Sequence, residues 1–324
     1  MLKSREITVV AEVNYASIDI GSNTFRLLIA KPSNGPLPWQ RIDYAHRITR
    51  LGEGLHHTGR LSETGMDRAL ATFSEFATLL SKYDIPAERT FAAATAAMRD
   101  AENGQQFAER VKTATGIHIQ IISGVDEARM SLSGACSVLN ADTQEDMMLF
   151  DIGGGSTEFI RARNKKRIDD ISCKLGVVRL VEAHLHSDPP STDDYNALKA
   201  AANEHLQSVE AHWPDCSAPR HLVGTAGTVT TLAAAALDLY PYDAEKINNY
   251  RMSRADFIAL RDRLLIMTHE QRQKIRTIEP GRADLIIAGL AIVDAVMQRW
   301  HYDELITVDA GLLEGLWLQI ANKT

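Results

Sequence analysis

One short pattern occurs twice in the chain and restricts its possible folds more than any other feature. Residues 17–30 and 147–161 each contain an apolar strand ending in Asp-Ile-Gly, a turn rich in small and hydroxyl residues, and a second apolar strand. A strand, a short turn and another strand predict a β-hairpin. Because the pattern is repeated, we expect two related half-domains that face one ligand.

The residues in both turns are typical of a phosphate-binding loop. Glycine lets backbone N–H groups approach an anion without interference from Cβ, and serine and threonine hydroxyls add donors. Asp19 and Asp151 end their strands, and Glu158 follows the second turn. Burying such carboxylates is costly unless they are paired or hold a cation. A lone triple glycine is more often a flexible turn, but the paired pattern predicts a phosphate clamp with a divalent cation.

Length and composition limit the class of protein. A chain of 324 residues is expected to form about two domains, and 45% hydrophobic with 24% charged residues is ordinary for a globular protein. The most apolar stretch, residues 285–293, is too short to span a bilayer, and the N-terminal residues do not match a secretory signal. Cysteines at positions 136, 173 and 216 lack metal-ligand spacing and suggest reduced thiols in the cytosol.

The net charge of −7 argues against a nonspecific nucleic-acid binder, which needs a basic excess. A phosphate-rich ligand must therefore be held by a local basic site. Arg26 and Arg99 are the first candidates, followed by Lys174, Arg179 and Arg282. Each of these cations, taken alone, is also explained as a solvated surface charge, and the sequence does not say which of the last three line the cleft.

Two further segments allow more than one interpretation. Ser123 is in position to cap a helix, with Asp126 three residues later as in a capping box. Glu127 points about 100° around the helix from Asp126, and no capping role requires it. A reactive carboxylate and a carboxylate that stabilises the helix N-terminus explain it equally well. The turn at residues 224–228 is likewise either an anion site at a helix N-terminus or a tight packing turn.

Alternating strands and helices predict an α/β protein with a duplicated core and a cleft between the halves. Besides the two hairpins, strands are expected at residues 90–94, 117–122 and 305–308. Helices are expected to begin at Ser62 and Ser123 and to occupy residues 104–116, 177–185, 192–213, 253–267 and 311–321.

The segments now described resemble the exopolyphosphatase and guanosine pentaphosphate phosphohydrolase family, in its short two-domain form. The matching segments are residues 18–24, 94–99, 122–129, 151–158, 224–228 and 282–284. The resemblance implies an α/β fold of two ribonuclease-H-like domains, as in the actin and sugar-kinase superfamily, with an interdomain cleft. It implies a first domain of residues 1–127 plus 310–324 and a second of residues 128–309.

The resemblance also implies roles for individual residues. Glu127 matches the catalytic glutamate that activates water, and Arg99 matches an arginine that contacts phosphate. Asp126 stands where the family usually has the first glutamate of a pair. The implied phosphate-binding residues are Ser22, Asn23, Thr24, Arg26, Gly153, Gly154, Gly155, Ser156 and Thr157. The implied ligands of Mg²⁺, or of another divalent cation, are Asp19, Asp151 and Glu158.

The expected reaction is hydrolysis of the terminal phosphate of inorganic polyphosphate or guanosine pentaphosphate by glutamate-activated water. The sequence does not rank these two substrates. We further expect a cytoplasmic homodimer that binds neither nucleic acid nor membrane. Two alternatives remain: an actin-like, ATP-dependent small-molecule kinase, and a non-catalytic sensor that binds the alarmone without turning it over.

Overall fold

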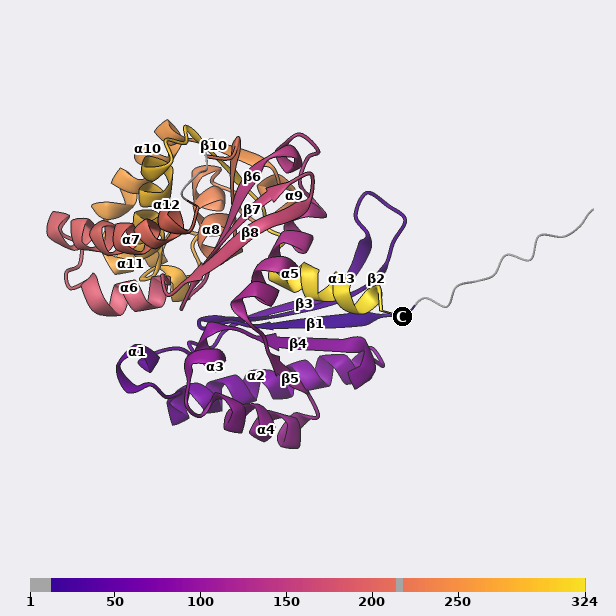
Figure 1. The fold of residues 1–324 in the computed structure, drawn as a ribbon. Coiled ribbons are helices and arrows are strands. Elements are labelled where there is room, and N and C mark those ends of the chain that lie inside the picture. Colours follow the sequence, from indigo (N-terminus) through magenta and orange to yellow (C-terminus); the bar gives the residue numbers. More distant parts are fainter. Residues whose placement is uncertain (1–12, 214–217, 324) are drawn as a thin grey trace, which may run out of the picture.

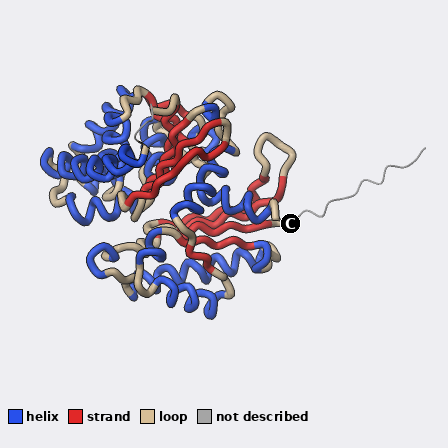
Figure 2. The backbone as a smooth tube through the Cα atoms, viewed as in Figure 1, coloured by secondary structure: helices blue, strands red, loops and turns tan. Residues whose placement is uncertain are grey.

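The computed structural model describes residues 13–213 and 218–323, which form two α/β halves (Figure 1). The N-terminal residues, for which no secretory signal was expected, and Cys216 lie outside this range. Each half is built on one mixed sheet, and helices pack against both sheets (Figure 2).

The first sheet has five strands in the order β3-β2-β1-β4-β5. Its strands β3, β2 and β1 are antiparallel, whereas β1, β4 and β5 are parallel. The strand bounds are β1 (Tyr15–Ile20), β2 (Thr24–Pro32), β3 (Trp39–Ile48), β4 (Thr90–Ala94) and β5 (Ile119–Ile121). Its core includes apolar residues of α2 (Glu63–Lys82) and α4 (Gly104–Thr115), and two short helices, α1 (Leu55–Thr58) and α3 (Ala96–Asp100), complete this half.

The second sheet repeats this arrangement and adds one strand. Its order is β10-β11-β9-β6-β7-β8, with β6, β7 and β8 antiparallel and β6, β9 and β11 parallel. The strand bounds are β6 (Met147–Ile152), β7 (Thr157–Arg163), β8 (Lys166–Cys173), β9 (His221–Thr225), β10 (Tyr250–Ser253) and β11 (Glu304–Thr307). The shared order and directions confirm the predicted duplication.

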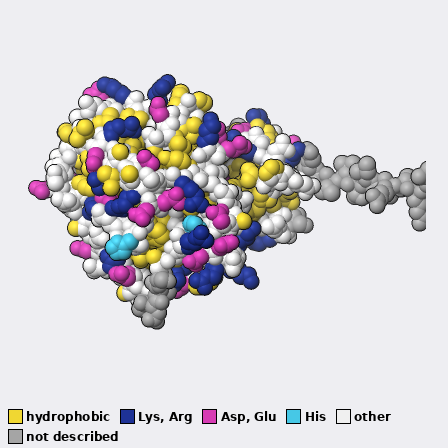
Figure 3. All heavy atoms as spheres, turned by 90° about the horizontal axis from the view of Figure 1, so that it is seen from above, with side chains coloured by type: hydrophobic (Ala, Val, Ile, Leu, Met, Phe, Trp, Pro, Cys, Tyr) yellow, Lys and Arg dark blue, Asp and Glu magenta, His cyan; other side chains and the backbone are white. Residues whose placement is uncertain are grey.

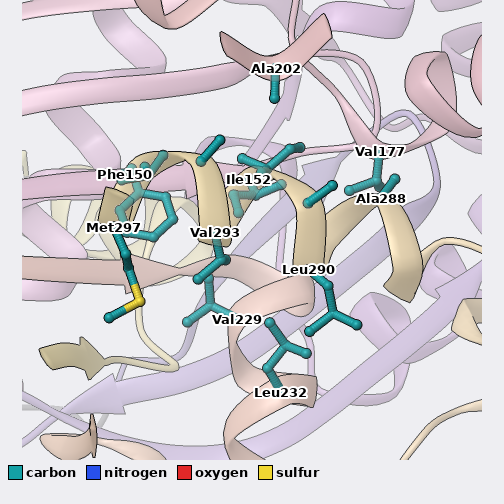
Figure 4. Packing of buried hydrophobic residues seen from close by; sticks show 14 of the residues in the cluster. Phe150, Ile152, Val177, Ala202, Val229, Leu232, Ala288, Leu290, Val293 and Met297 are labelled. Carbon is teal, nitrogen blue, oxygen red and sulfur yellow. The ribbon is translucent and has the colours of Figure 1, made fainter. Parts of the chain in front are cut away.

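The helices of the second half surround one nearly all-apolar helix, α12 (Ile286–Arg299). It packs with side chains of β6 and of neighbouring helices (Figure 4). The apolar run noticed in the sequence is thus a core helix, and no helix within the described ranges is long and apolar enough to cross a membrane. The helices packed directly on α12 are α6 (Val177–His184), α7 (Thr192–His212), α8 (Ala226–Ala236) and α10 (Arg254–Leu265). Two short helices, α9 (Ala244–Ile247) and α11 (His269–Gln273), complete this half.

One carboxylate, Asp294, interrupts the apolar surface of α12. Its side chain has no solvent exposure and lies against three cations and a tyrosine. Lys199 Nζ is 2.9 Å from Oδ2, Arg261 Nη1 is 3.1 Å from Oδ2, and Arg254 Nη2 is 3.3 Å from Oδ1. Burial raises the pKa of this carboxyl, but the nearby cations outweigh burial and lower it below the ordinary value. Asp294 therefore ties α7 and α10 to the core helix as an ion.

Two crossing helices lie between the sheets: α5 (Gly124–Cys136) and the C-terminal α13 (Leu312–Ala321) (Figure 1). Their backbones touch through glycines. A Cβ on Gly134 would lie 1.9 Å from the Gly311 carbonyl oxygen, and one on Gly315 would lie 1.9 Å from that of Met130. The last helix also packs on β1, β2 and β4, so the end of the chain returns to the first sheet and holds α5 in place.

Candidate active site

The two repeated turns meet at the junction of the halves. A Cβ on Gly155 would lie 2.8 Å from Ser22 Oγ, and one on Gly154 would lie 3.0 Å from Ser22 Cβ. Neither glycine has a positive φ angle. The triple glycine is therefore explained chiefly by the close approach of the two loops, rather than by a backbone conformation that only glycine adopts.

A cavity of about 100 Å³ opens beside this contact. Most of the predicted site residues line it, and they come from both hairpins and from α5. Those residues are Asp19, Ser22, Asn23, Thr24, Arg26, Glu127, Asp151, Gly153 and Gly154. Arg99, Gly155, Ser156, Thr157 and Glu158 lie around the cavity without lining it.

The loops present unused hydrogen-bonding groups. Among the residues that the structure describes, the backbone N–H groups of Ser22, Asn23, Gly154 and Gly155 have no hydrogen-bond partner. Asn23 Oδ1 is buried and likewise has none in the described part of the chain. Buried polar groups are normally paired. A polar ligand bound in the adjacent cavity would supply the missing hydrogen-bond partners.

The hairpins have the same register, but the facing pair is oppositely charged in the first hairpin and acidic on both sides in the second. Asp19 faces Arg26 across β1 and β2, while Asp151 faces Glu158 at the same position of β6 and β7. Arg26 donates to Asp19 Oδ2 through Nε at 3.0 Å and Nη2 at 2.6 Å. The two charges of the first hairpin thus cancel. Arg26, predicted to bind phosphate, forms an ion pair with a carboxylate instead. The second hairpin carries two acidic groups without a counterion between them.

The second acidic pair is buried. Burial raises the pKa of Asp151, although the Ser131 hydroxyl donates to its Oδ2 at 2.8 Å. Burial, followed by the charge of Asp151, raises the pKa of Glu158 to about 7. Ser172, which does not line the cavity, donates to Glu158 Oε1 at 2.7 Å. The acidic pair is therefore electrostatically unfavourable by itself.

These residues fit a magnesium ion only in part. No group of three or more potential protein ligands is assembled within the described residues, so the predicted set of Asp19, Asp151 and Glu158 does not form a three-carboxylate cage. Asp19 and Asp151 both line the cavity, however. Mg²⁺ commonly uses one or two carboxylates and completes its shell with water and phosphate oxygens. Asp19 and Asp151 are suited to that kind of site, whereas Glu158 does not line the cavity.

Glu127 faces the cavity from the first turn of α5. It is 6% exposed, and Arg99 Nη1 donates to its Oε2 at 3.0 Å. The same Arg99 atom donates to the Ile122 carbonyl at 3.0 Å, which fixes the guanidinium behind the carboxylate. Burial and the charge of Glu158 raise the pKa of Glu127 well above its ordinary value, while Arg99 opposes the rise. Arg99 is thus placed to position Glu127.

The helix that carries Glu127 is capped as predicted, with one difference. Ser123 Oγ accepts from the Asp126 backbone N–H at 3.1 Å. Asp126 does not complete a capping box through the Ser123 backbone, because its carboxylate accepts the Ser123 hydroxyl at 2.8 Å instead. Asp126 also pairs with Arg129 at 3.2 Å on the exposed side of the helix. Only the second carboxylate of this pair reaches the cavity.

Thr157 has a structural hydrogen bond. It was expected in the second phosphate loop, but it is fully buried in β7 and its hydroxyl donates to the Leu175 carbonyl. The strand alternation that turns Glu158 to one face turns Thr157 to the other.

The turn at residues 224–228, which the sequence explains either as an anion site or as a packing turn, packs closely and lies beside the cavity. Ala226, Gly227 and Thr228 line the cavity at the N-terminus of α8. A Cβ on Gly227 would lie 1.7 Å from Arg282 Nη1, so this glycine makes room for a cation that also lines the cavity. Thr231 and Leu312 line it too and were not predicted, because neither belongs to a recognisable motif.

Ion pairs join the halves on both sides of the cavity. On one side, Arg179 donates to the Gly155 carbonyl at 2.8 Å and pairs with Asp100 at 2.5 Å. On the other, Arg50 pairs with Asp284 at 3.0 Å. Of the three cations that the sequence left unplaced, Arg282 lines the cavity, Arg179 lines a neighbouring small pocket at the loops, and Lys174 is exposed and lines neither.

Comparisons with known proteins agree with this geometry. Exopolyphosphatase 2 of Mycobacterium tuberculosis is 33% identical over 97% of this chain and 100% of the relative. The guanosine-5'-triphosphate,3'-diphosphate pyrophosphatase of Aliivibrio fischeri is 29% identical over 93% of this chain and 58% of that longer protein. Both names describe phosphoanhydride hydrolases.

Solved structures show the same fold. An exopolyphosphatase from Cytophaga hutchinsonii has a TM-score of 0.88 with 28% identity, covering 96% of this chain and 99% of the other. The Aquifex aeolicus member of the Ppx/GppA family has a TM-score of 0.79 with 31% identity and the same coverage. The predicted fold class of two related α/β halves with a cavity between them is confirmed. The model of the Ppx/GppA phosphatase family matches residues 28–324, and the chain therefore belongs to that family.

Proposed function

We propose that the protein is a metal-dependent phosphohydrolase that releases the terminal phosphate of inorganic polyphosphate or guanosine pentaphosphate. The observation that carries the proposal is the position of Glu127, a buried carboxylate that faces two loops with unpaired backbone N–H groups across one cavity. The named activities of relatives at 33% and 29% identity support the same reaction class.

The loops would bind the terminal phosphoryl group. Backbone N–H groups of Ser22, Asn23 and Gly154, which line the cavity, can donate to its oxygens, and the contact between the loops fixes their positions. Preorganised donors of this kind stabilise charge that develops in the transition state. Arg282 adds a positive charge on the same cavity wall. A Mg²⁺ ion held by Asp19 and Asp151 would supply further charge neutralisation at the phosphoryl oxygens.

Glu127 would act as the general base. A water oxygen attacks the terminal phosphorus, its proton passes to a carboxylate oxygen of Glu127, and the bond to the bridging oxygen breaks so that this oxygen leaves with the electron pair. The raised pKa of Glu127 makes it a stronger base than an exposed glutamate, and the Arg99 guanidinium favours its charged form. Catalysis then rests mainly on positioning and electrostatics.

The proposal is tested by Glu127→Gln, with Asp126→Asn as the matched control one residue away on the same helix turn. We expect Glu127→Gln to lower kcat by about 10²- to 10⁴-fold with little change in KM. Asp126→Asn should stay within a few-fold of the wild type, because its carboxylate points to solvent and Arg129. Equal activity of both variants would contradict the assignment.

Assays of the wild-type protein distinguish the proposed hydrolase from a kinase and from a sensor. Phosphate release from tripolyphosphate and from guanosine pentaphosphate, measured side by side, establishes the substrate preference. Formation of ADP from ATP only in the presence of an acceptor would instead identify a kinase. Tight binding of guanosine pentaphosphate without any phosphate release would identify a sensor.

A further inference from the structure

A second, open depression lies outside the cavity, on the opposite face of the helix that carries Glu127. It has a volume of about 400 Å³. One wall is the exposed stripe of α5 and the residue after it, and the other wall is the β7–β8 turn. We call it the basic groove, and its lining residues are Arg129, Leu132, Ser133, Cys136, Ser137, Lys165 and Arg167.

The basic groove has a charge opposite to that of the chain. The protein carries a net charge of −7, and acidic and basic side chains are interspersed on the face shown in Figure 3. The groove is lined by three cations and no carboxylate. Arg129 and Arg167 each have one acidic neighbour, at Asp126 and Asp170. Lys165, together with the adjacent Lys166, has no ion-pair partner among the described residues.

Backbone hydrogen bonds hold the turn that carries Lys165 and leads into Arg167. Asn164 and Lys165 both have positive φ angles, of 51° and 64°, as in the tight turns that join β-hairpin strands. The Asn164 N–H donates to the Glu145 carbonyl at 3.2 Å, and the Lys165 N–H donates to the Gln144 carbonyl at 3.3 Å. The turn is therefore anchored to a neighbouring segment, and its cations keep a defined position over α5.

We propose that the basic groove is a second binding site for a linear oligophosphate, which retains part of a polyphosphate substrate outside the catalytic cavity. Three cations and the hydroxyl of Ser133 match a repeating anion with several acceptor oxygens. A nucleic acid fits less well, because the groove offers no aromatic side chain on which a base could stack. This inference rests on the proposed polyphosphate substrate.

The groove is separate from the catalytic machinery but close to it. Arg129 is two residues after Glu127, about 200° around the helix, and Ser137 is about 15 Å further along the axis than Glu127. A chain long enough to leave the cavity can therefore reach the groove, whereas a triphosphate bound in the cavity cannot fill both sites. A comparison of long polyphosphate with tripolyphosphate as substrates should accordingly reveal the second site.

The test is the triple substitution Arg129→Gln, Lys165→Gln and Arg167→Gln. A control with the same change in charge, Arg60→Gln, Arg110→Gln and Lys112→Gln, removes three exposed cations of the first half. The groove variant should raise KM for long polyphosphate by roughly 3- to 100-fold, since exposed ion pairs each contribute modestly. Its kcat, and its KM for tripolyphosphate, should match those of the control.

Salt dependence gives an independent measure. For single-stranded polyanions the slope of log affinity against log salt is about 0.7 per neutralised charge, so the slope should fall by about 2 in the groove variant. Direct titration of long polyphosphate onto Glu127→Gln protein, with and without the groove substitutions, reports binding without turnover. Weaker binding of long polyphosphate to the protein with the groove substitutions supports the groove, whether or not the wild type releases phosphate. Absence of phosphate release by the wild type would refute the proposed function instead.

Three results would overturn the inference. The groove and control variants could bind long polyphosphate equally. The groove variant could lose affinity for tripolyphosphate as strongly as for long chains, which would place the effect in the cavity. A single-stranded oligonucleotide of matched charge could displace long polyphosphate from the groove as well as polyphosphate does, which would identify a nonspecific anion surface.

Discussion

Asp294→Asn should destabilise the second half of the protein although it leaves the shape of the side chain unchanged. In the wild type, a carboxylate with no solvent exposure balances Lys199, Arg254 and Arg261. The substitution removes that charge and leaves three cations around a neutral amide. Asparagine can still accept hydrogen bonds, so the experiment isolates the charge.

The magnitude follows from the burial of both partners. Removing one member of a buried ion pair typically costs about 3–5 kcal/mol. The three cations keep 20–24% side-chain exposure, so water can partly solvate them and the lower end applies. With an unfolding entropy of about 2.1 cal/mol/K per residue, 324 residues give about 0.7 kcal/mol/K, so about 3 kcal/mol lowers Tm by about 4 °C.

Thermal unfolding followed by circular dichroism at pH 7 measures this shift. Asp262→Asn is the matched control, because Asp262 also pairs with Arg261, at 2.8 Å, but its side chain is 59% exposed. We expect the control to change Tm by less than about 1 °C. A Tm for Asp294→Asn within that range of the control would refute the argument that this buried charge ties the helices together.

The pH dependence provides a second check on Asp294. The pKa of this carboxyl is lowered in the folded state, so its stabilising contribution is present above the unfolded pKa of about 3.9. The contribution is lost as the pH falls through the lower, folded pKa. The Tm difference between wild type and Asp294→Asn should therefore be constant near neutrality and should shrink below about pH 4.

Three other perturbations test the site and its supports. Gly315→Ala should lower kcat by roughly tenfold or more, since its Cβ would lie 1.9 Å from the Met130 carbonyl oxygen and displace the helix that carries Glu127. Gly35→Ala, in a surface turn, is the control. An unchanged kcat in both variants would contradict the reasoning. Burial raises the pKa of Glu314 to about 7, so wild-type stability should fall between about pH 4.5 and 7 as the unfolded chain loses this proton first. Glu314→Gln should consequently gain Tm relative to the wild type from pH 5 to pH 8, and a difference independent of pH would count against it. Asp151→Asn should raise the Mg²⁺ concentration needed for half-maximal phosphate release, whereas full wild-type activity in excess chelator would rule out the metal requirement.

The sequence predicted the parts of the fold that combine a clear pattern with burial. Both Asp-Ile-Gly hairpins were found because their strands are continuously apolar, and β1 and β6 are buried along their whole length. The strand that follows each hairpin, β3 in the first sheet and β8 in the second, was not predicted. Both strands carry mostly exposed or half-buried residues, so neither shows the apolar alternation of a buried face.

The residues of the site were easier to predict than their partners. Glu127 and the two loops were predicted and lie at the cavity, but the ion pair of Arg26 with Asp19 was not predicted. Its signal was present: Asp19 and Arg26 are seven residues apart, as are Asp151 and Glu158, so each pair had to face across its hairpin. The role of Arg282 depends on contacts between segments more than 200 residues apart, which no local pattern encodes.

The two ion pairs beside the cavity join the halves only weakly. Arg50 with Asp284 and Arg179 with Asp100 are all partly exposed, and pairs of this kind contribute about 0.2–1 kcal/mol each. Together they favour the arrangement in which both pairs are formed by only a few-fold to some thirtyfold over one in which both are broken. Ion pairs of this strength break and re-form by thermal motion alone. Salt, which weakens these pairs, should therefore act on substrate capture and phosphate escape as well as on binding affinity.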